Sequence, residues 1–264
     1  MFLTIYIICI GIFSTVMITI YIKKYKKLSV KVWIPGAAWT RAMIYFSFCN
    51  IFITATGTLE QIINQPLFSA EQITNIYWVV YCIFCFFYVF SAYWILWSRM
   101  TLTFDRKYYL LTEILFGIVW GFSTGGLLLS FYHLWSLAVT LSWIRYLFSF
   151  VTIGLWQYFI HDYFWDVYIS PEHDTPKSIF IKTIVCHIPN MVISLGFLTI
   201  WGNYAIFILI YIVALVASTI FQKFPAPWAK GQFHAPMTKP GISGFLRGSG
   251  YLEDKDKIEV INEN

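Results

Sequence analysis

The sequence predicts an all-α membrane protein, a polytopic bundle of about seven transmembrane helices with its N-terminus outside and its C-terminus in the cytoplasm. Three observations support this fold class. About seven runs are apolar and long enough to cross a bilayer, and charge is confined almost entirely to the segments between them. Hydrophobic residues make up 59% of the 264 residues and charged residues 12%, whereas a soluble domain carries about a quarter charged residues. A soluble fold is therefore excluded.

The predicted spans, in chain order, are residues 2–22, 38–60, 74–98, 109–131, 137–159, 176–201 and 204–221. The first has no basic residue before it and four lysines after it, which is typical of an uncleaved reverse signal anchor. The second follows the turn Pro35-Gly36, and the third ends in a basic loop with Arg99, Arg106 and Lys107. The loop between these two spans contains no Lys or Arg.

The later spans continue the alternation. The fourth and fifth are joined by a short connection around His133 that carries no cation, and the sixth and seventh are separated only by Gly202-Asn203. Lys223 then opens another basic segment. Because every basic loop falls on one side, the positive-inside rule places that side in the cytoplasm. The net charge of +5 thus indicates topology, and we expect membrane lipids and no nucleic acid as partners.

The chain divides into a helix bundle over residues 1–223 and a cytoplasmic tail over residues 224–264. The tail is rich in Pro and Gly and then in charged residues, so we expect it to be extended or disordered until a partner binds. It is a candidate contact for a membrane-protein partner.

Polar residues inside a span are costly, so their positions suggest which helices face the interior. Four spans carry a polar or small-residue stripe at helical spacing, namely Ser47, Asn50, Thr54 and Gln61; Glu113, Gly117, Gly121 and Gly125; Ser142, Arg145, Ser149 and Thr152; and Thr183, His187, Asn190 and Ser194. Glycines every four residues allow a neighbouring helix to approach closely. We therefore expect spans two, four, five and six to form the interior, and spans one, three and seven to face lipid.

Depth decides which ionisable residues meet. Glu113 and Arg145 differ by roughly 15 Å along the membrane normal, so we do not expect an ion pair between them. Arg145 is expected to extend outward toward Glu60. His187 lies nearer the depth of Glu113, and Pro189 is expected to kink the sixth helix and free a backbone carbonyl there.

The most polar segment of the chain contains His161, Asp162 and Asp166. If the fifth helix continues this far, the two aspartates share one face, and carboxylates with imidazole bind a divalent metal ion or transfer protons. We therefore predict His161, Asp162, Asp166, Glu113 and His187 as catalytic residues, with the first three as candidate metal ligands. For the neighbouring residues Glu172, His173 and Asp174 we favour an ordinary place at helix N-termini, next to Ser170-Pro171 and Thr175-Pro176.

Other motifs add little. Cys82 and Cys85 form a C-x-x-C on an aromatic helix, which favours packing over redox or metal chemistry. The seventh span contains no lysine, which excludes a retinal Schiff base.

Three functions remain open on the sequence. The favoured hypothesis is an enzyme that acts on a lipid or isoprenoid-like substrate at the cytoplasmic leaflet through the His/Asp cluster. The alternatives are a transporter or channel in which Arg145 and Glu113 are successive stations, and a non-catalytic subunit of a membrane complex.

Overall fold

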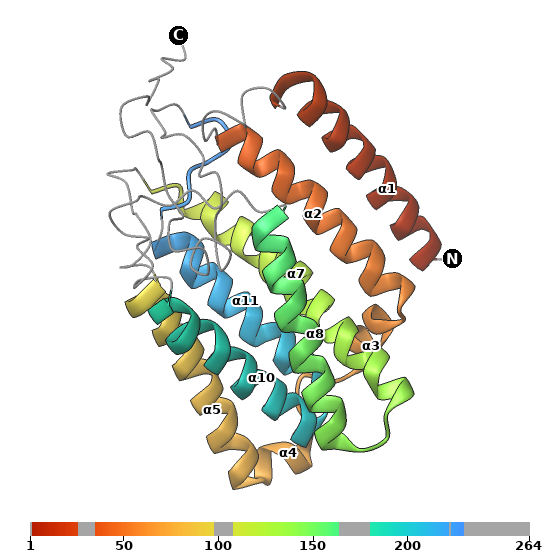
Figure 1. Cartoon of the computed structure of the whole chain (residues 1–264), viewed down its shortest axis with the longest axis vertical. Coiled ribbons are helices and arrows are strands. Elements are labelled where there is room, and N and C mark those ends of the chain that lie inside the picture. The colour runs from red at the N-terminus through yellow and green to blue at the C-terminus, as the bar shows by residue number, and fades with distance from the viewer. Residues whose placement is uncertain (1, 26–34, 98–107, 164–179, 222, 230–264) are drawn as a thin grey trace.

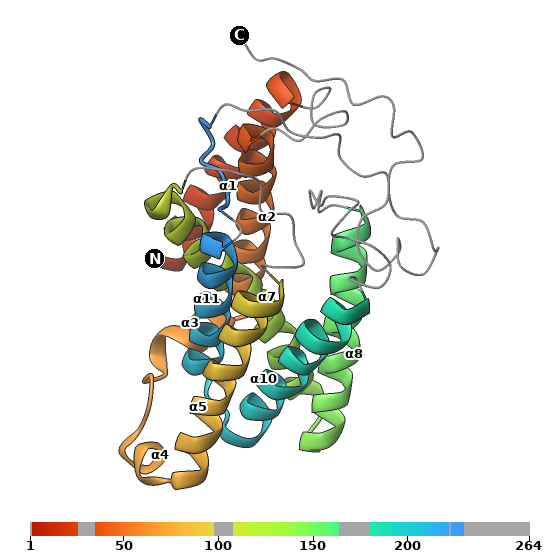
Figure 2. The ribbon, with the colours of Figure 1, turned by 90° about the vertical axis from the view of Figure 1, so that its left-hand side faces the viewer.

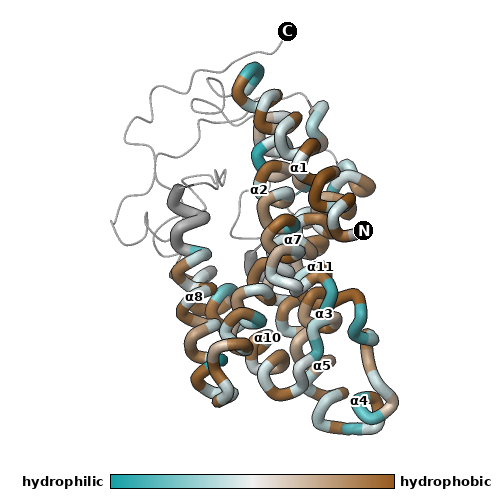
Figure 3. The backbone as a smooth tube through the Cα atoms, turned by 90° about the vertical axis from the view of Figure 1, so that its right-hand side faces the viewer, coloured by the Kyte–Doolittle hydropathy of each residue, from teal (hydrophilic) through white to brown (hydrophobic). Residues whose placement is uncertain are grey.

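The computed structural model describes residues 2–25, 35–97, 108–163, 180–221 and 223–229. Within these ranges the chain is nearly all helical and contains no strand (Figure 1). Five helices in the described part are long and apolar enough to cross a membrane, or six if the bent pair α2 and α3 is one span. Apolar residues follow these helices along their length (Figure 3). The described part of the chain thus has the nearly all-helical, apolar character of an integral membrane protein.

The elements are α1 (Phe2–Ile20), η1 (Tyr21–Tyr25), α2 (Pro35–Ala55), α3 (Thr58–Asn64), α4 (Ala70–Thr74), α5 (Ile76–Ser91), η2 (Ala92–Trp97), α7 (Leu110–Ala138), α8 (Ser142–Tyr163), η3 (Lys182–His187), α10 (Ile188–Trp201) and α11 (Tyr204–Phe221). The three η elements are π-helical turns that continue α1 and α5 or precede α10. Each of the seven apolar runs of the sequence contains a helix. The predicted connection at His133 is wrong, because α7 continues to Ala138 and the link to α8 is residues 139–141.

The centre of the bundle is the pair α7 and α11, which pack backbone to backbone. A Cβ atom added to Gly117 would lie 2.5 Å from the Cα of Val216, and one added to Gly121 would lie 2.5 Å from the Cα of Ile212. Gly125 continues the row against the side chain of Tyr211. The prediction that this glycine face points into the bundle is therefore confirmed, and its partner is α11.

The expectation that the seventh span faces lipid is wrong. α11 packs against α7, α5 and η2, and many of its residues are buried. It carries almost no polar residues, so a search for polar stripes misses it. The glycines of α7 allow the close contact between the two helices, and dispersion between their apolar surfaces stabilises it. The first span does lie at the periphery, since none of its apolar window is buried.

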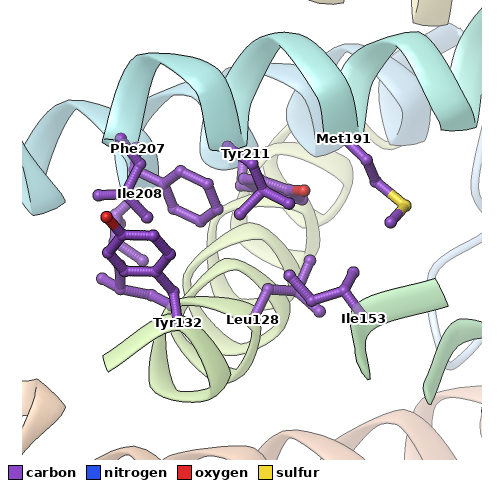
Figure 4. Packing of buried hydrophobic residues seen from close by; sticks show 10 residues of the cluster. Leu128, Tyr132, Ile153, Met191, Phe207, Ile208 and Tyr211 are labelled. Carbon is purple, nitrogen blue, oxygen red and sulfur yellow. The ribbon is translucent and has the colours of Figure 1, made fainter. Parts of the chain in front are cut away.

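Four helices meet in the main apolar cluster (Figure 4). Leu128 of α7, Ile153 of α8, Met191 of α10 and Tyr211 of α11 belong to this cluster. This cluster fixes α8 and α10 onto the α7–α11 pair, and so positions the polar ends of those helices.

The second predicted span is broken rather than continuous. α2 ends at Ala55, and α3 continues at an angle of 80°. Gly57 makes the bend with a φ of 76°, a left-handed conformation that glycine adopts without steric cost. The hydroxyl of Thr56 bonds to the Phe52 carbonyl at 2.9 Å and to Ser130 of α7 at 3.2 Å, so the broken helix end keeps hydrogen-bond partners.

The entry to α10 bears on the predicted kink at Pro189. η3 is wound as a π-helix directly before Pro189, which lies in the first turn of α10. Proline has no N–H to donate to the carbonyl four residues earlier. That carbonyl, of Val185, instead accepts a hydrogen bond of 2.6 Å from the hydroxyl of Tyr88 on α5.

Candidate functional site

Glu113 is a fully buried carboxylic acid in the first turns of α7, with 0% of its surface exposed. Its Oε1 accepts a hydrogen bond of 3.1 Å from the backbone N–H of Tyr109, the residue that caps the helix. The partial positive charge of a helix N-terminus favours a carboxylate there. Its Oε2 is buried and has no hydrogen-bond partner in the structure. One carboxyl oxygen of Glu113 therefore has a hydrogen-bond donor, and the other has none.

The end of α11 lies against this acid. The hydroxyl of Thr219 donates to the backbone oxygen of Glu113 at 2.8 Å. Lys223 is an electrostatic neighbour of the carboxyl group, and its ammonium lies 4.9 Å from the centre of the Tyr108 ring. A cation and a hydroxyl thus accompany the acid at this end of the bundle.

Residues 223–229, which we name the strap, pack over the same end. The ring of Phe224 stacks on Phe116 of α7 at 4.4 Å, and the indole N–H of Trp39 on α2 donates to the Pro225 carbonyl at 2.9 Å. Ala226 is fully buried. These first residues of the predicted tail are irregular in conformation and pack on the bundle, because their apolar side chains contact α2 and α7. Residues 230–264 lie outside the described residues.

The predicted His/Asp cluster lies at and beyond the end of the described part of α8. His161 and Asp162 belong to the last turn of α8, but their side chains are not described, and Asp166 lies outside the described residues. Among the described residues no group of three or more His, Cys, Asp and Glu could hold a metal ion. The described part of the chain therefore gives no support for the predicted divalent metal.

His187 ends η3, which packs against η2, whereas the α7 helix that carries Glu113 packs mainly against α11 and α2. The expected contact between Glu113 and His187 stays a prediction. Cys85 of the C-x-x-C is buried and Cys82 is half-buried, both as free thiols, in agreement with packing.

Arg145 does not extend toward Glu60 as expected. Its guanidinium donates to the carbonyl oxygens of Val139, at 3.2 Å, and Thr140, at 3.3 Å, just past the end of α7. It also lies over the ring of Tyr132 at 5.7 Å. A helix C-terminus presents unpaired carbonyls and partial negative charge, which a cation satisfies locally.

The part of the predicted polar stripe that lies on α2 does face the interior, with Ser47 and Thr54 buried, whereas Gln61 is exposed on α3. The amide nitrogen of Asn50 donates to the hydroxyl of Ser123 on α7 at 2.8 Å, and its amide oxygen accepts from the hydroxyl of Tyr6 on α1 at 3.0 Å. Asn50 thereby joins three helices.

Sequence reasoning missed a second polar junction, among α2, α7 and α8. There the hydroxyl of Tyr45 lies beside the Thr124 hydroxyl and the Trp156 indole. Among 18 Tyr and 12 Trp, nothing in the spacing distinguishes these two rings from residues at the headgroup level.

Comparison of the chain with family models, curated proteins and solved structures finds no match. The fold and the site thus define a helical protein of membrane character, with a buried carboxylic acid beneath the strap.

Proposed function

We propose that this protein is a membrane enzyme that acts on a lipid or isoprenoid-like substrate at the cytoplasmic leaflet. One observation carries the proposal: Glu113 is fully buried, yet one of its two carboxyl oxygens has no hydrogen-bond partner. A helix interface gains nothing from such a group, because an unsatisfied polar atom in an apolar medium costs free energy. A proton-transferring or substrate-binding acid needs that free oxygen.

The first turns of α7, which carry Glu113, and the last turn of α8 lie at the same end of the bundle, although the two helices diverge from their link (Figure 2). α7 and α8 are joined by a link of only three residues, 139–141, so their far ends lie at the same end of the bundle. At 1.5 Å per residue, His161 lies about 29 Å from this link and Glu113 about 38 Å. In this proposal the end of α8 faces the substrate headgroup and Glu113 lies toward the membrane surface.

The roles follow from the residue types. Glu113 exchanges a proton with the substrate, and His187 lines the same pocket. His161, Asp162 and Asp166 would hold a divalent metal ion, which would supply a Lewis acid for an anionic headgroup. Without a metal, the same three residues would act as acid and base.

We also propose that the C-terminus is cytoplasmic and the N-terminus outside, across seven spans. The basic segments converge in the structure: a Cβ atom on Gly36 would lie 2.6 Å from the Tyr25 hydroxyl, after Lys23 and Lys24, and 3.4 Å from the Pro227 carbonyl oxygen. A protease-sensitive tag at the C-terminus should be cleaved only from the cytoplasmic side. Cleavage from the outside of intact cells would contradict this topology.

The test of the enzyme proposal uses purified protein in phosphatidylcholine vesicles that contain farnesyl diphosphate, with and without MgCl₂, and mass spectrometry of the lipids. Glu113→Gln, which keeps the shape of the side chain, should lower turnover by at least about a hundredfold, as expected for loss of a general acid or base. Glu60→Gln is the matched control, because Glu60 is exposed on α3. Asp162→Asn and His161→Ala should also abolish turnover in folded protein.

Wild-type turnover in these variants would contradict the proposal. If wild-type protein forms no product but carries a solute or ion across the vesicle membrane, and Glu113→Gln blocks that flux, the transporter alternative is correct. A stable co-purifying subunit without either activity would favour the non-catalytic role.

A further inference from the structure

The strap, residues 223–229, begins with the turn that ends α11. The N–H of Phe224 donates to the carbonyl oxygen of Thr219 at 3.0 Å, and the N–H of Lys223 donates to that of Ile220 at 3.0 Å. These two bonds form a Schellman motif, in which the residue at the position of Lys223 is left-handed and is usually glycine. Lys223 has a φ of 48°. The chain therefore holds a strained backbone at the point where it leaves the helix.

Beyond this turn the backbone of the strap is stiff. Pro225 and Pro227 each fix their own φ, and each also restricts the residue before it. Lys223 comes before these restricted residues. A stiff segment that joins a helix at one strained residue can move as a unit about that residue.

Side chains hold the strap on α2 and α7, beside the start of α2 (Figures 1 and 2). The ring of Phe224 stacks on Phe116 at 4.4 Å, and the Trp39 indole meets the same Phe116 ring edge-on at 4.6 Å. The Trp39 indole also donates to the Pro225 carbonyl oxygen at 2.9 Å. Contacts of this kind separate at lower cost than the α7–α11 pair, which packs backbone to backbone.

Thr219 connects the strap to Glu113. Its hydroxyl donates to the backbone oxygen of Glu113 at 2.8 Å, and its carbonyl oxygen accepts from Phe224. Phe116, on which Phe224 stacks, comes three residues after Glu113 and so lies on the same face of α7. The strap thus begins beside a buried acid that has one carboxyl oxygen without a partner. Such an acid can react only if a neighbouring segment moves, and the strap is held less firmly than α11.

We propose that the strap is a lid over Glu113, closed in this structure, which rotates about Lys223 and opens a path from the membrane surface to the carboxyl group. This role of the strap rests on the proposed function of Glu113, since it regulates that site. The closed lid gains the Phe224 stack and the Trp39 hydrogen bond, whereas the open lid relieves the left-handed backbone of Lys223. These opposing contributions are of similar size, so both positions are accessible.

The test measures how fast a water-soluble carbodiimide with glycine ethyl ester converts Glu113 to an amide in the full-length protein in detergent. Mass spectrometry of the Glu113 peptide gives the rate, and the exposed Glu60 is the internal reference. Phe224→Ala should raise the Glu113 rate about tenfold, because the ring stack is lost. Trp228→Ala is the matched control, because Trp228 lies in the same strap and is 66% exposed. Equal rates in these two variants would overturn the proposal.

The backbone of Lys223 can be tested separately. Lys223→Gly and Lys223→Ala both remove the ammonium group, but only glycine adopts the left-handed conformation without steric cost. Glycine should therefore keep the lid closed for more of the time, and the Glu113 rate should be about fivefold lower than in Lys223→Ala. Equal rates in this pair would overturn rotation about Lys223.

Trp39→Phe keeps a ring but removes the N–H donor, so it should raise the Glu113 rate about fivefold, the value expected for one hydrogen bond. Thermal unfolding shows whether each variant is folded at the temperature of the reaction. Unchanged Glu113 rates in the strap variants, with turnover lost in Glu113→Gln, would overturn the lid alone. Strap-dependent rates, with wild-type turnover in Glu113→Gln, would support the lid and overturn the enzyme proposal.

Discussion

Gly121 of α7 lies so close to Ile212 of α11 that a Cβ atom on the glycine would be 2.5 Å from the Cα of the isoleucine. The obstructing atom is backbone, so no side-chain rotation relieves the overlap. The two central helices are therefore held at a separation that only glycine permits.

Gly121→Ala should destabilise the protein by about 2 kcal/mol, in the range found for overpacking. Gly11→Ala on α1 is the matched control, because a Cβ there meets nothing within 4 Å. Both variants gain the same helix propensity, so the difference between their midpoints of thermal unfolding in detergent reports the clash. Equal midpoints would show that α7 and α11 separate without cost.

Asn50→Leu should lower stability by about 1 to 2 kcal/mol, because it removes the hydrogen bonds to Tyr6 and Ser123 and leaves their hydroxyls in an apolar setting. Ser123→Ala alone should cost less. A double-mutant cycle on unfolding free energies should give a coupling of about 0.6 kcal/mol or more between the two residues. Strict additivity would mean that the contact contributes nothing.

Arg145→Met should lower stability by about 1 kcal/mol, because it leaves the carbonyls of Val139 and Thr140 without their donor. Any turnover or flux should persist in the folded variant, since Arg145 serves the end of α7. A selective loss of flux at unchanged stability would restore Arg145 as a station in a transport pathway.

Truncation separates the strap from the rest of the tail. A chain ending after Ala229 should unfold at the wild-type temperature, whereas one ending after Phe221 should unfold at a lower temperature. The longer chain keeps the Phe224–Phe116 stack and the bond from Trp39 to Pro225, and the shorter one loses both. Trp39→Phe offers a milder version of the same loss. Identical unfolding of the two truncated chains would mean that the strap does not stabilise the bundle.

Some of the site could be predicted from local pattern. The spacing of Glu113 with three glycines indicated that this face of α7 is buried, and Asn50 was expected to face inward; both are confirmed because a polar or small residue in a membrane helix has few alternatives to an interior position. The hydrogen-bond partners of Arg145 are not predictable from the sequence, because they are backbone carbonyls, which every residue has.

The sequence by itself determined two things: that the apolar runs suit a lipid bilayer, and where along the chain the helices form. Hydropathy and the confinement of charge decide both, since the cost of a charge or an unpaired backbone group in lipid is local to each segment. The tertiary structure alone decided that the apolar α11 is central, that α2 bends at Gly57, and that Tyr45, Thr124 and Trp156 meet from three helices. Between helices in lipid there is little hydrophobic driving force, so these contacts depend on shape and on pairings distant in the chain.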